Sequence, residues 1–118
     1  MKRGEIWTVA GGPDYASKPR PCVIIQNDAY NETASITVCS ITSDPTESPA
    51  FRMLIEATKE NGLERMSRLM ADKVTTVPKS KLGKKIGQLS ILDLQKLNQS
   101  IIIFLGLADT NNDTMSGA

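Results

Sequence analysis

The residue best suited to chemistry in this 118-residue chain is Arg20, which stands between Pro19 and Pro21 at the start of an apolar run. Each proline fixes its own φ and favours an extended backbone at the residue before it, so we expect Lys18 and Arg20 to be extended. A guanidinium is planar, permanently charged and carries five N–H donors. On a stiff backbone this group is suited to binding a phosphate, although a solvated arginine or a surface ion pair is the simpler alternative.

The absence of histidine limits the chemistry that the chain can perform. Without histidine, neither a Ser-His-Asp triad nor RNA cleavage by a pair of histidines is possible. Gly11-Gly12 lacks the spacing of a P-loop or a Rossmann motif, and the acidic residues show no metal-ligand spacing. We therefore predict that an enzyme with this sequence uses no metal and no organic cofactor.

RNA cleavage fits these limits, because RNA carries its own nucleophile in the 2′-hydroxyl. The enzyme has to orient this oxygen in line with the scissile bond, stabilise the extra negative charge and manage two protons. Arg20 can stabilise the charge, but it cannot be the base, because arginine keeps its proton in proteins. The group that protonates the leaving oxygen is left open by the sequence.

The composition is that of one small globular domain, with 40% hydrophobic and 23% charged residues. The formal net charge is +1, so RNA binding would depend on a local arrangement of charge. The first residues lack the apolar segment of a signal peptide, and the longest apolar run, 101–105, is too short to span a bilayer, so we expect a cytoplasmic protein with no membrane partner. Cys22 and Cys39 lie in apolar runs and are expected to be buried free thiols.

Alternating apolar residues and turn signals predict a mainly β chain with one terminal helix. In the strand expected over 35–41, Ile36 and Val38 should face one way, and Cys39 and Ile41 the other. A basic turn should follow Pro78; it could form a phosphate track, although a solvated turn is the simpler interpretation. Many short strands before one helix are typical of a small, curled, mostly antiparallel barrel. The expected strands cover 5–10, 21–26, 35–41, 51–56, a long bent segment within 66–77, and 86–89.

The helix is expected over 92–107, because Ser90 and Asp93 match a capping box and apolar residues follow at helical spacing. Its C-terminal half is apolar almost all round, so more than one face must be covered, and a second copy of the chain is the natural cover. We expect a single domain over 1–108 and a polar, disordered tail over 109–118.

The chain also resembles a known family in an ordered set of short motifs. The resemblance extends over about residues 2–107 and is to the MazF/PemK toxin endoribonucleases of type II toxin–antitoxin systems. It implies a homodimer of small SH3-like curled antiparallel barrels of the MazF/CcdB type. The motifs are Arg3-Gly4-Glu5-Ile6-Trp7, Arg20-Pro21 leading into a strand that ends Gln26-Asn27-Asp28, and Ile41-Thr42-Ser43.

Several site residues are implied by this resemblance. The arginine of the Arg-Pro motif and the hydroxyl of the Ile-Thr motif are the family's catalytic pair, and these positions match Arg20 and Thr42. Ser43 is adjacent and is a candidate for binding phosphate. Asp72 and Lys73 lie where family members carry acidic and polar residues near the RNA groove.

The first loop supplies two further candidates, and the chain departs from some relatives at two points. Tyr15 and Lys18 are candidate RNA contacts, by stacking and by charge. Some relatives carry an arginine two residues before the acid, where this chain has Met70, so that Arg–Asp pair is expected to be absent. Some also have a histidine in the first loop, which this chain lacks.

The function implied by the resemblance is cleavage of single-stranded RNA at specific sequences, without metal, in a groove at a homodimer interface. A cognate antitoxin would inhibit the toxin by covering that groove. Two alternatives stay open. Gyrase-poisoning toxins share this architecture, but they act through aromatic and apolar residues at the very end of the helix, where this chain has a polar tail. A small RNA- or protein-binding barrel without activity is the other alternative.

Overall fold

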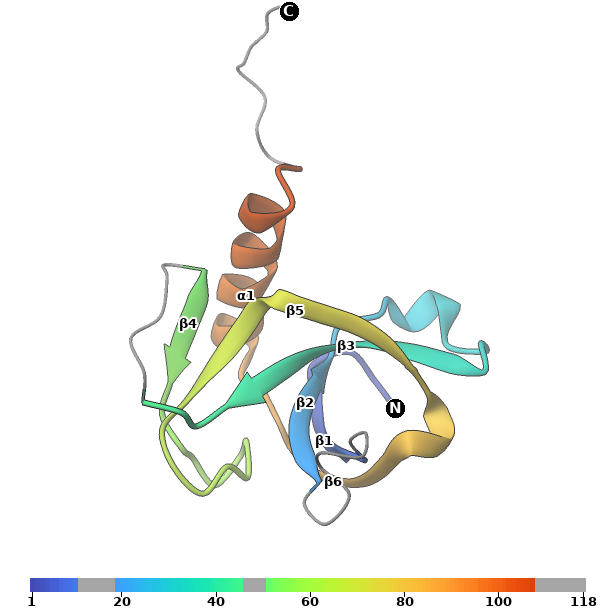
Figure 1. The fold of residues 1–118 in the computed structure, drawn as a ribbon, viewed down its shortest axis with the longest axis horizontal. Coiled ribbons are helices and arrows are strands. Elements are labelled where there is room, and N and C mark those ends of the chain that lie inside the picture. Colours follow the sequence, from blue (N-terminus) through green and yellow to red (C-terminus); the bar gives the residue numbers. More distant parts are fainter. Residues whose placement is uncertain (11–18, 46–50, 108–118) are drawn as a thin grey trace, which may run out of the picture.

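The computed structural model describes residues 1–10, 19–45 and 51–107, and these form one strongly curled antiparallel sheet with a helix beside it (Figure 1). The strand order in this six-stranded sheet is β4-β5-β3-β2-β1-β6. The predicted class, mainly β with a C-terminal helix, is confirmed. The elements are β1 (Glu5–Val9), β2 (Arg20–Ile24), the 3₁₀ turn η2 (Asp28–Tyr30), β3 (Ser35–Thr42), β4 (Arg52–Ile55), β5 (Ser67–Pro78), the 3₁₀ turn η3 (Lys79–Lys81), β6 (Leu82–Gln88) and α1 (Ile91–Phe104).

The curl of the sheet creates two hydrophobic clusters, one on each face of β2 and β3. Side chains alternate along a strand, so both sets of residues are buried only where both faces are covered. Ile36 and Val38 belong to one cluster, whereas Cys39 and Ile41 belong to the other, as the alternation predicted. The second of these clusters is covered by α1 through the fully buried Leu97.

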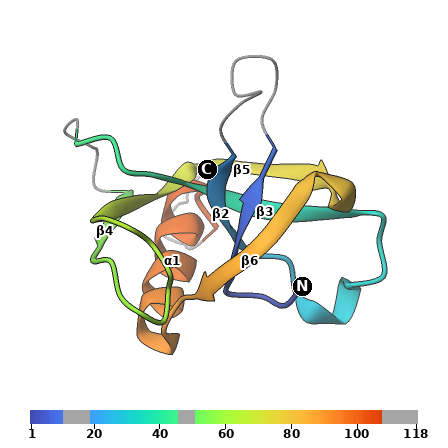
Figure 2. The same ribbon diagram turned by 90° about the horizontal axis from the view of Figure 1, so that it is seen from below.

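Strand β5 is irregular where it passes β3, as the length of the predicted segment suggested. Cys39 pairs with Val74, yet Ile41, only two residues on, pairs with Leu69. Residues 70–73 of β5 therefore have fewer partners on β3 than a regular ladder would give, and the strand bends there. In Figures 1 and 2 the part of β5 before this bend lies beside β4 and α1, and the part after it runs toward β6.

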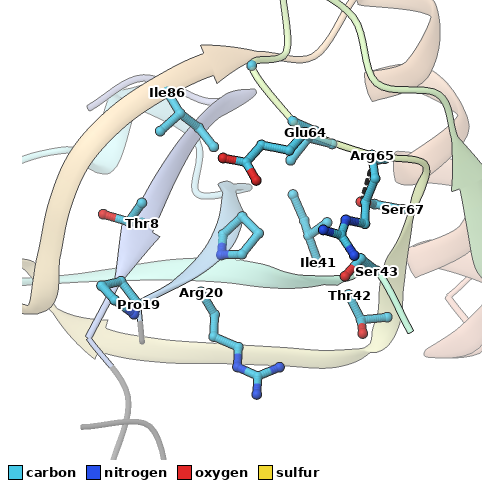
Figure 3. Close-up of a pocket in the computed structure, with 13 residues that line it drawn as sticks. Thr8, Pro19, Arg20, Ile41, Thr42, Ser43, Glu64, Arg65, Ser67 and Ile86 are labelled. Atoms are coloured by element: carbon cyan, nitrogen blue, oxygen red, sulfur yellow. Dashed lines mark hydrogen bonds between the residues drawn. The ribbon is translucent and has the colours of Figure 1, made fainter. Parts of the chain in front are cut away.

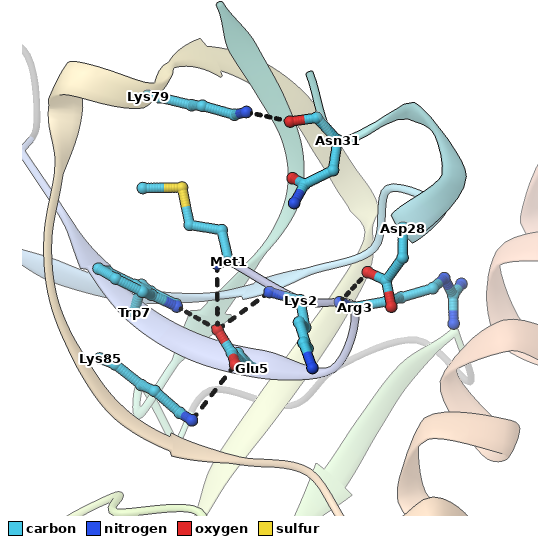
Figure 4. Close-up of polar contacts among 9 residues, drawn as sticks. All are labelled: Met1, Lys2, Arg3, Glu5, Trp7, Asp28, Asn31, Lys79 and Lys85. Carbon is cyan, nitrogen blue, oxygen red and sulfur yellow. Dashed lines mark hydrogen bonds and ion pairs between the residues drawn. The ribbon is translucent and has the colours of Figure 1, made fainter. Parts of the chain in front are cut away.

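The last strand is longer than predicted, because β6 begins at Leu82 and not at residue 86. The sequence around Lys84 and Lys85 is polar and was interpreted as a turn, but an edge strand needs no apolar pattern on its solvated face. Two lysines of the predicted basic turn also have protein partners (Figure 4). The ammonium of Lys79 donates to the carbonyl of Asn31, and Lys85 lies 3.2 Å from Glu5.

Polar contacts fasten the N-terminal segment to the rest of the fold (Figure 4). Burial raises the pKa of the Glu5 carboxyl, but hydrogen bonds from Trp7 Nε1 and the Lys2 N–H, together with Lys85, outweigh that effect, so its pKa is lowered. Arg3 donates from Nε to the Ile25 carbonyl at 2.8 Å and from Nη2 to Asn98 Oδ1 at 2.7 Å. Arg3 therefore links the end of β2 to the middle of α1.

Helix α1 starts with the predicted cap, in which Ser90 Oγ accepts from the Asp93 N–H at 3.0 Å. Its apolar C-terminal end is exposed in the single chain, with Ile103 at 70% and Leu105 at 55%. Among the described residues, no helix is long and apolar enough to cross a membrane. The predicted tail over 109–118 lies outside the described residues, so the domain boundary at 108 stays a prediction.

Candidate active site

A pocket of about 450 Å³ opens where the ends of β2 and β3 meet the segment between β4 and β5 (Figure 3). Three of the predicted site residues, Arg20, Thr42 and Ser43, line this pocket together, although they come from two strands and the turn that follows β3. The lining residues are Thr8, Pro19, Arg20, Pro21, Ile41, Thr42, Ser43, Gly62, Leu63, Glu64, Arg65, Ser67 and Ile86.

Arg20 reaches the pocket because it is the first residue of β2, where it pairs with Val9 of β1. Its side chain is exposed, and the prolines on either side of it also line the pocket. The two rings form a rigid wall of the pocket and hold the backbone from which the guanidinium extends. This places a permanent positive charge beside an open cavity, as binding of a phosphate requires.

Thr42 is the last residue of β3 and is half-buried in the pocket wall. Its Oγ1 accepts a hydrogen bond from the backbone N–H of Asp44 at 3.1 Å. A hydroxyl that accepts in this way still has its own proton to donate, and the bond fixes its rotamer. Thr42 therefore offers an O–H donor at a defined position. Ser43, which follows, is exposed and presents a second hydroxyl to the same pocket.

The third wall of the pocket, residues 62–65, was not anticipated from the sequence. An Asn-Gly pair such as Asn61-Gly62 is typical of a turn, yet Asn61 is 3% exposed and its side chain organises the segment. Its Oδ1 accepts from the N–H groups of Thr58 and Leu63, at 2.9 and 3.0 Å, and its Nδ2 donates to the Glu56 carbonyl at 2.8 Å.

Gly62 allows this segment to pack directly against the β6 backbone. It has a φ of +70°, and a Cβ at this position would overlap the carbonyl of Ile86. Two and three residues after Gly62, the side chains of Glu64 and Arg65 line the pocket. In the sequence, this wall is marked only by an Asn-Gly pair with two charged residues after Leu63, and this pattern indicates a turn without indicating a pocket.

The other predicted site residues lie elsewhere. Asp72 and Lys73 lie in the bend of β5 and do not line the pocket, and Tyr15 and Lys18 lie outside the described residues. An arginine does accompany the acid, although Met70 replaces the arginine found in some relatives. Arg52 on β4 stands opposite Met70, and its guanidinium binds both Asp72 carboxylate oxygens at 2.9 and 2.7 Å.

This Arg52–Asp72 pair keeps both groups charged. Its hydrogen bonds lower the pKa of the Asp72 carboxyl and raise the pKa of the Arg52 guanidinium. The expectation that an Arg–Asp pair is absent concerned only an arginine two residues before the acid, where the chain has Met70; the folded protein pairs Asp72 with a different arginine, Arg52. Strand pairing supplies the arginine from a position 20 residues earlier in the chain.

The two cysteines take no part in the pocket. Both are free and buried, as predicted. Burial raises the pKa of the Cys22 thiol to about 11 and that of the Cys39 thiol to about 12. Since the thiolate is the nucleophilic form, these groups are unreactive near neutral pH.

Comparison with known proteins connects this fold and pocket to one class. Residues 2–105 match the family described as "PemK-like, MazF-like toxin of type II toxin-antitoxin system". The chain is 44% identical over 108 residues to "Probable endoribonuclease MazF" of Mycolicibacterium smegmatis, which covers 92% of this chain and 99% of that protein. It is 32% identical over 116 residues to "Endoribonuclease MazF9" of Mycobacterium tuberculosis, which covers 91% and 98% of the two chains.

Solved structures agree on the fold. An "Endoribonuclease in complex with its cognate antitoxin from Mycobacterial species" superposes with a TM-score of 0.74 at 23% identity, and it covers 91% of this chain and 96% of that one. The Mycobacterium tuberculosis toxin MazF-mt6 gives a TM-score of 0.73 at 23% identity, with 86% and 96% covered. These structures show that the fold is the curled sheet with one helix described above. The chain belongs to the PemK-like, MazF-like toxin family of type II toxin–antitoxin systems.

Proposed function

We propose that this protein is a sequence-specific, metal-independent endoribonuclease that cleaves single-stranded RNA and acts as the toxin of a toxin–antitoxin pair. One observation carries the proposal: Arg20, Thr42 and Ser43 line a single open pocket in a chain whose relatives at 44% and 32% identity are named endoribonucleases. The pocket offers a guanidinium and two hydroxyls to one bound phosphate, and it is open to an extended strand.

In this proposal Arg20 binds the scissile phosphate and stabilises the charge that builds up as the 2′-hydroxyl attacks. The Thr42 hydroxyl donates to a second phosphate oxygen, with its orientation fixed by the Asp44 N–H. Because the donors are in place before the reaction, they need no reorganisation as charge develops. The products are a 5′-hydroxyl end and a cyclic or 3′-phosphate end.

RNA beyond the scissile phosphate would extend along neighbouring surfaces. Lys73 is exposed and follows Asp72, whose carboxylate is held by Arg52, so this region of β5 offers a cation and a fixed polar edge. We assign Asp72 and Lys73 to binding of flanking nucleotides and not to catalysis. Tyr15 and Lys18 stay candidates for the same role from the first loop.

A cleavage assay in chelator tests this function. The purified protein is incubated with a long single-stranded RNA in excess EDTA, and primer extension maps the cut sites. We expect cuts at a recurring short sequence, with 5′-hydroxyl ends. Intact RNA in this assay, together with inhibition of gyrase supercoiling by the same preparation, would replace the proposal with the gyrase-poisoning alternative.

Replacement of Thr42 by alanine should lower the cleavage rate by about ten- to a hundredfold, because one donor to the phosphate is lost while Arg20 remains. Thr42→Ser, which keeps the hydroxyl, should retain most of the activity. Single-turnover rates on one mapped site provide the measurement. If Thr42→Ala cuts as fast as the wild type, the hydroxyl has no part in the reaction.

We also propose that the protein is a cytoplasmic homodimer that a cognate antitoxin inhibits by covering the RNA site. The exposed end of α1 supports a second copy as its cover. The rings of Phe51 and Phe104 pack there at an angle of 51°, with centroids 4.9 Å apart, and line an apolar hollow that Ile103 also lines. Apolar area of this kind is normally covered in an oligomer. The exposed apolar residues at this end of the chain are Ile102, Ile103, Phe104, Leu105 and Leu107.

Ile103→Asp should convert the dimer into a monomer, because a carboxylate would be buried at the interface. Light scattering after size-exclusion chromatography should then give a mass near the 12.8 kDa of one chain, against about twice that for the wild type. Gln95→Asp, at an exposed polar position of the same helix, is the matched control and should stay dimeric. A dimeric Ile103→Asp variant would place the interface elsewhere.

A further inference from the structure

We propose that Glu64 is the general base that takes the proton from the attacking 2′-hydroxyl, an inference that rests on the proposed endoribonuclease function. The nucleophile must lose a proton as it attacks, and neither Arg20 nor Thr42 is suited to accept it. An arginine keeps its proton, and a hydroxyl becomes a base only after losing its own at high pH.

One described side chain that lines the pocket is suited to accept this proton. Among the described residues that line it, the ionisable side chains are those of Arg20, Glu64 and Arg65, and Glu64 is the only carboxylate. The chain has no histidine that could take this role. A carboxylate is ionised at neutral pH and can accept a proton directly.

Glu64 also lies inside the pocket that Arg20 lines. In Figure 3 its side chain extends inward between Ile86 and Ile41, and Arg20 lies on the opposite wall. In Figure 3 the Arg20 guanidinium extends away from Glu64, so a nucleotide bound by Arg20 would have to span the pocket to bring its 2′-hydroxyl to the carboxylate. The side chain is exposed to the cavity, so substrate can reach it without rearrangement of the core.

The segment that carries Glu64 is rigid for identifiable reasons. Asn61 makes its three side-chain hydrogen bonds while almost fully buried, and the Gln88 N–H of β6 donates to the Glu60 carbonyl at 2.9 Å. On the other side, Ser67 Oγ donates to the Arg65 carbonyl at 2.9 Å. Bonds on both sides thus fix the backbone at residue 64. Such support is what a catalytic group requires and a solvated loop residue does not.

In the proposed step, one bond to phosphorus forms and another breaks. A Glu64 carboxylate oxygen takes the proton of the 2′-hydroxyl, and the oxygen uses the freed electron pair to bond to phosphorus. The bond from phosphorus to the 5′-oxygen breaks, and that oxygen leaves with the bonding pair and takes a proton from a water molecule. The hydroxide formed then takes the proton from Glu64 through solvent, which restores the carboxylate. The products are a 2′,3′-cyclic phosphate and a 5′-hydroxyl.

The test compares Glu64→Gln with Glu60→Gln, a matched change at an exposed glutamate of the same segment that does not line the pocket. We expect Glu64→Gln to lower the single-turnover rate by about a hundredfold or more, within the usual range for loss of a general base. Glu60→Gln should stay within about twofold of the wild type. Affinity for an RNA with a 2′-deoxy nucleotide at the cut site should be unchanged in both variants, since the defect lies in the chemistry.

A substrate with a modified leaving group distinguishes a general base from a general acid. When sulfur replaces the 5′-oxygen, the leaving group needs no proton, so loss of a general acid is rescued while loss of a base is not. We expect Glu64→Gln to stay slow on this substrate. Full rescue would overturn the assignment as base, as would equal rates of wild type and Glu64→Gln on normal RNA. An Asp44→Asn variant with the larger defect would transfer the role to that carboxylate. Failure of the wild type to cut any RNA would instead overturn the proposed function itself.

Discussion

Replacing Arg20 by alanine is expected to lower the rate of RNA cleavage by about a thousandfold while the protein stays folded. The guanidinium is the positive group that the prolines hold at the pocket wall, and loss of such a group from a phosphate-transfer site commonly costs three or more orders of magnitude. The side chain is exposed and belongs to neither hydrophobic cluster, so the free energy of unfolding should change little.

Arg20→Lys is the informative control for this variant. Lysine keeps the charge but loses the planar pair of donors, so we expect an intermediate rate if bidentate binding matters. Single-turnover cleavage and thermal unfolding should be measured on the same preparations. An Arg20→Ala variant that cuts normally would remove Arg20 from the reaction. A variant that unfolds would show that the arginine is part of a structural ion pair.

Gly62→Ala is expected to be the most destabilising single-methyl change in the pocket, with a loss of roughly 3 kcal/mol or more in the free energy of unfolding. Part of this is the cost of a positive φ for a residue with a Cβ, about 1 to 2 kcal/mol. The rest arises because the new methyl would overlap the Ile86 carbonyl, which belongs to the β6 backbone and cannot rotate away. Because Glu64 follows two residues later, activity should also fall in whatever fraction stays folded.

Gly106→Ala separates the two contributions. Gly106 has a similar φ, +74°, but a Cβ there would meet nothing of its own chain within 4 Å, so within the chain only the backbone cost applies. Denaturant unfolding of both variants at one protein concentration should show Gly62→Ala to be the less stable by about 2 kcal/mol. Equal losses would mean that the 58–66 segment moves freely away from β6, and the rigid support inferred for Glu64 would then be absent.

Local patterns were sufficient to predict most of the fold. Alternation along residues 35–41 assigned Ile36 and Cys39 to opposite faces, and the Ser90 cap located the start of α1. The start of β6 was missed, because Gly83 and Lys84 resemble a turn when considered alone. Their pairing with β1 depends on a partner strand more than 70 residues earlier, and local sequence does not report such pairing.

Some residues of the candidate site could likewise be predicted from the sequence, and others could not. Arg20 could be singled out because two prolines and an apolar run reveal its position at the start of a strand, whereas Thr42 was predicted only from the resemblance to the family. Glu64 and the Arg52–Asp72 pair could not be predicted, because each depends on which segments meet in three dimensions. Asn61 shows why: its sequence neighbourhood indicates a turn, whereas its burial and hydrogen bonds show that it holds one wall of the pocket.

Binding of the scissile phosphate by Arg20 and Thr42 can be tested with a crystal structure of the protein bound to a short RNA that spans a mapped cut site. This RNA carries a 2′-deoxy nucleotide immediately 5′ of the scissile phosphate. We expect the scissile phosphate in the pocket, bonded to the Arg20 guanidinium and the Thr42 hydroxyl, with the 2′ position facing Glu64. A scissile phosphate bound elsewhere, for example along Lys79 to Lys85 with the pocket empty, would contradict this expectation.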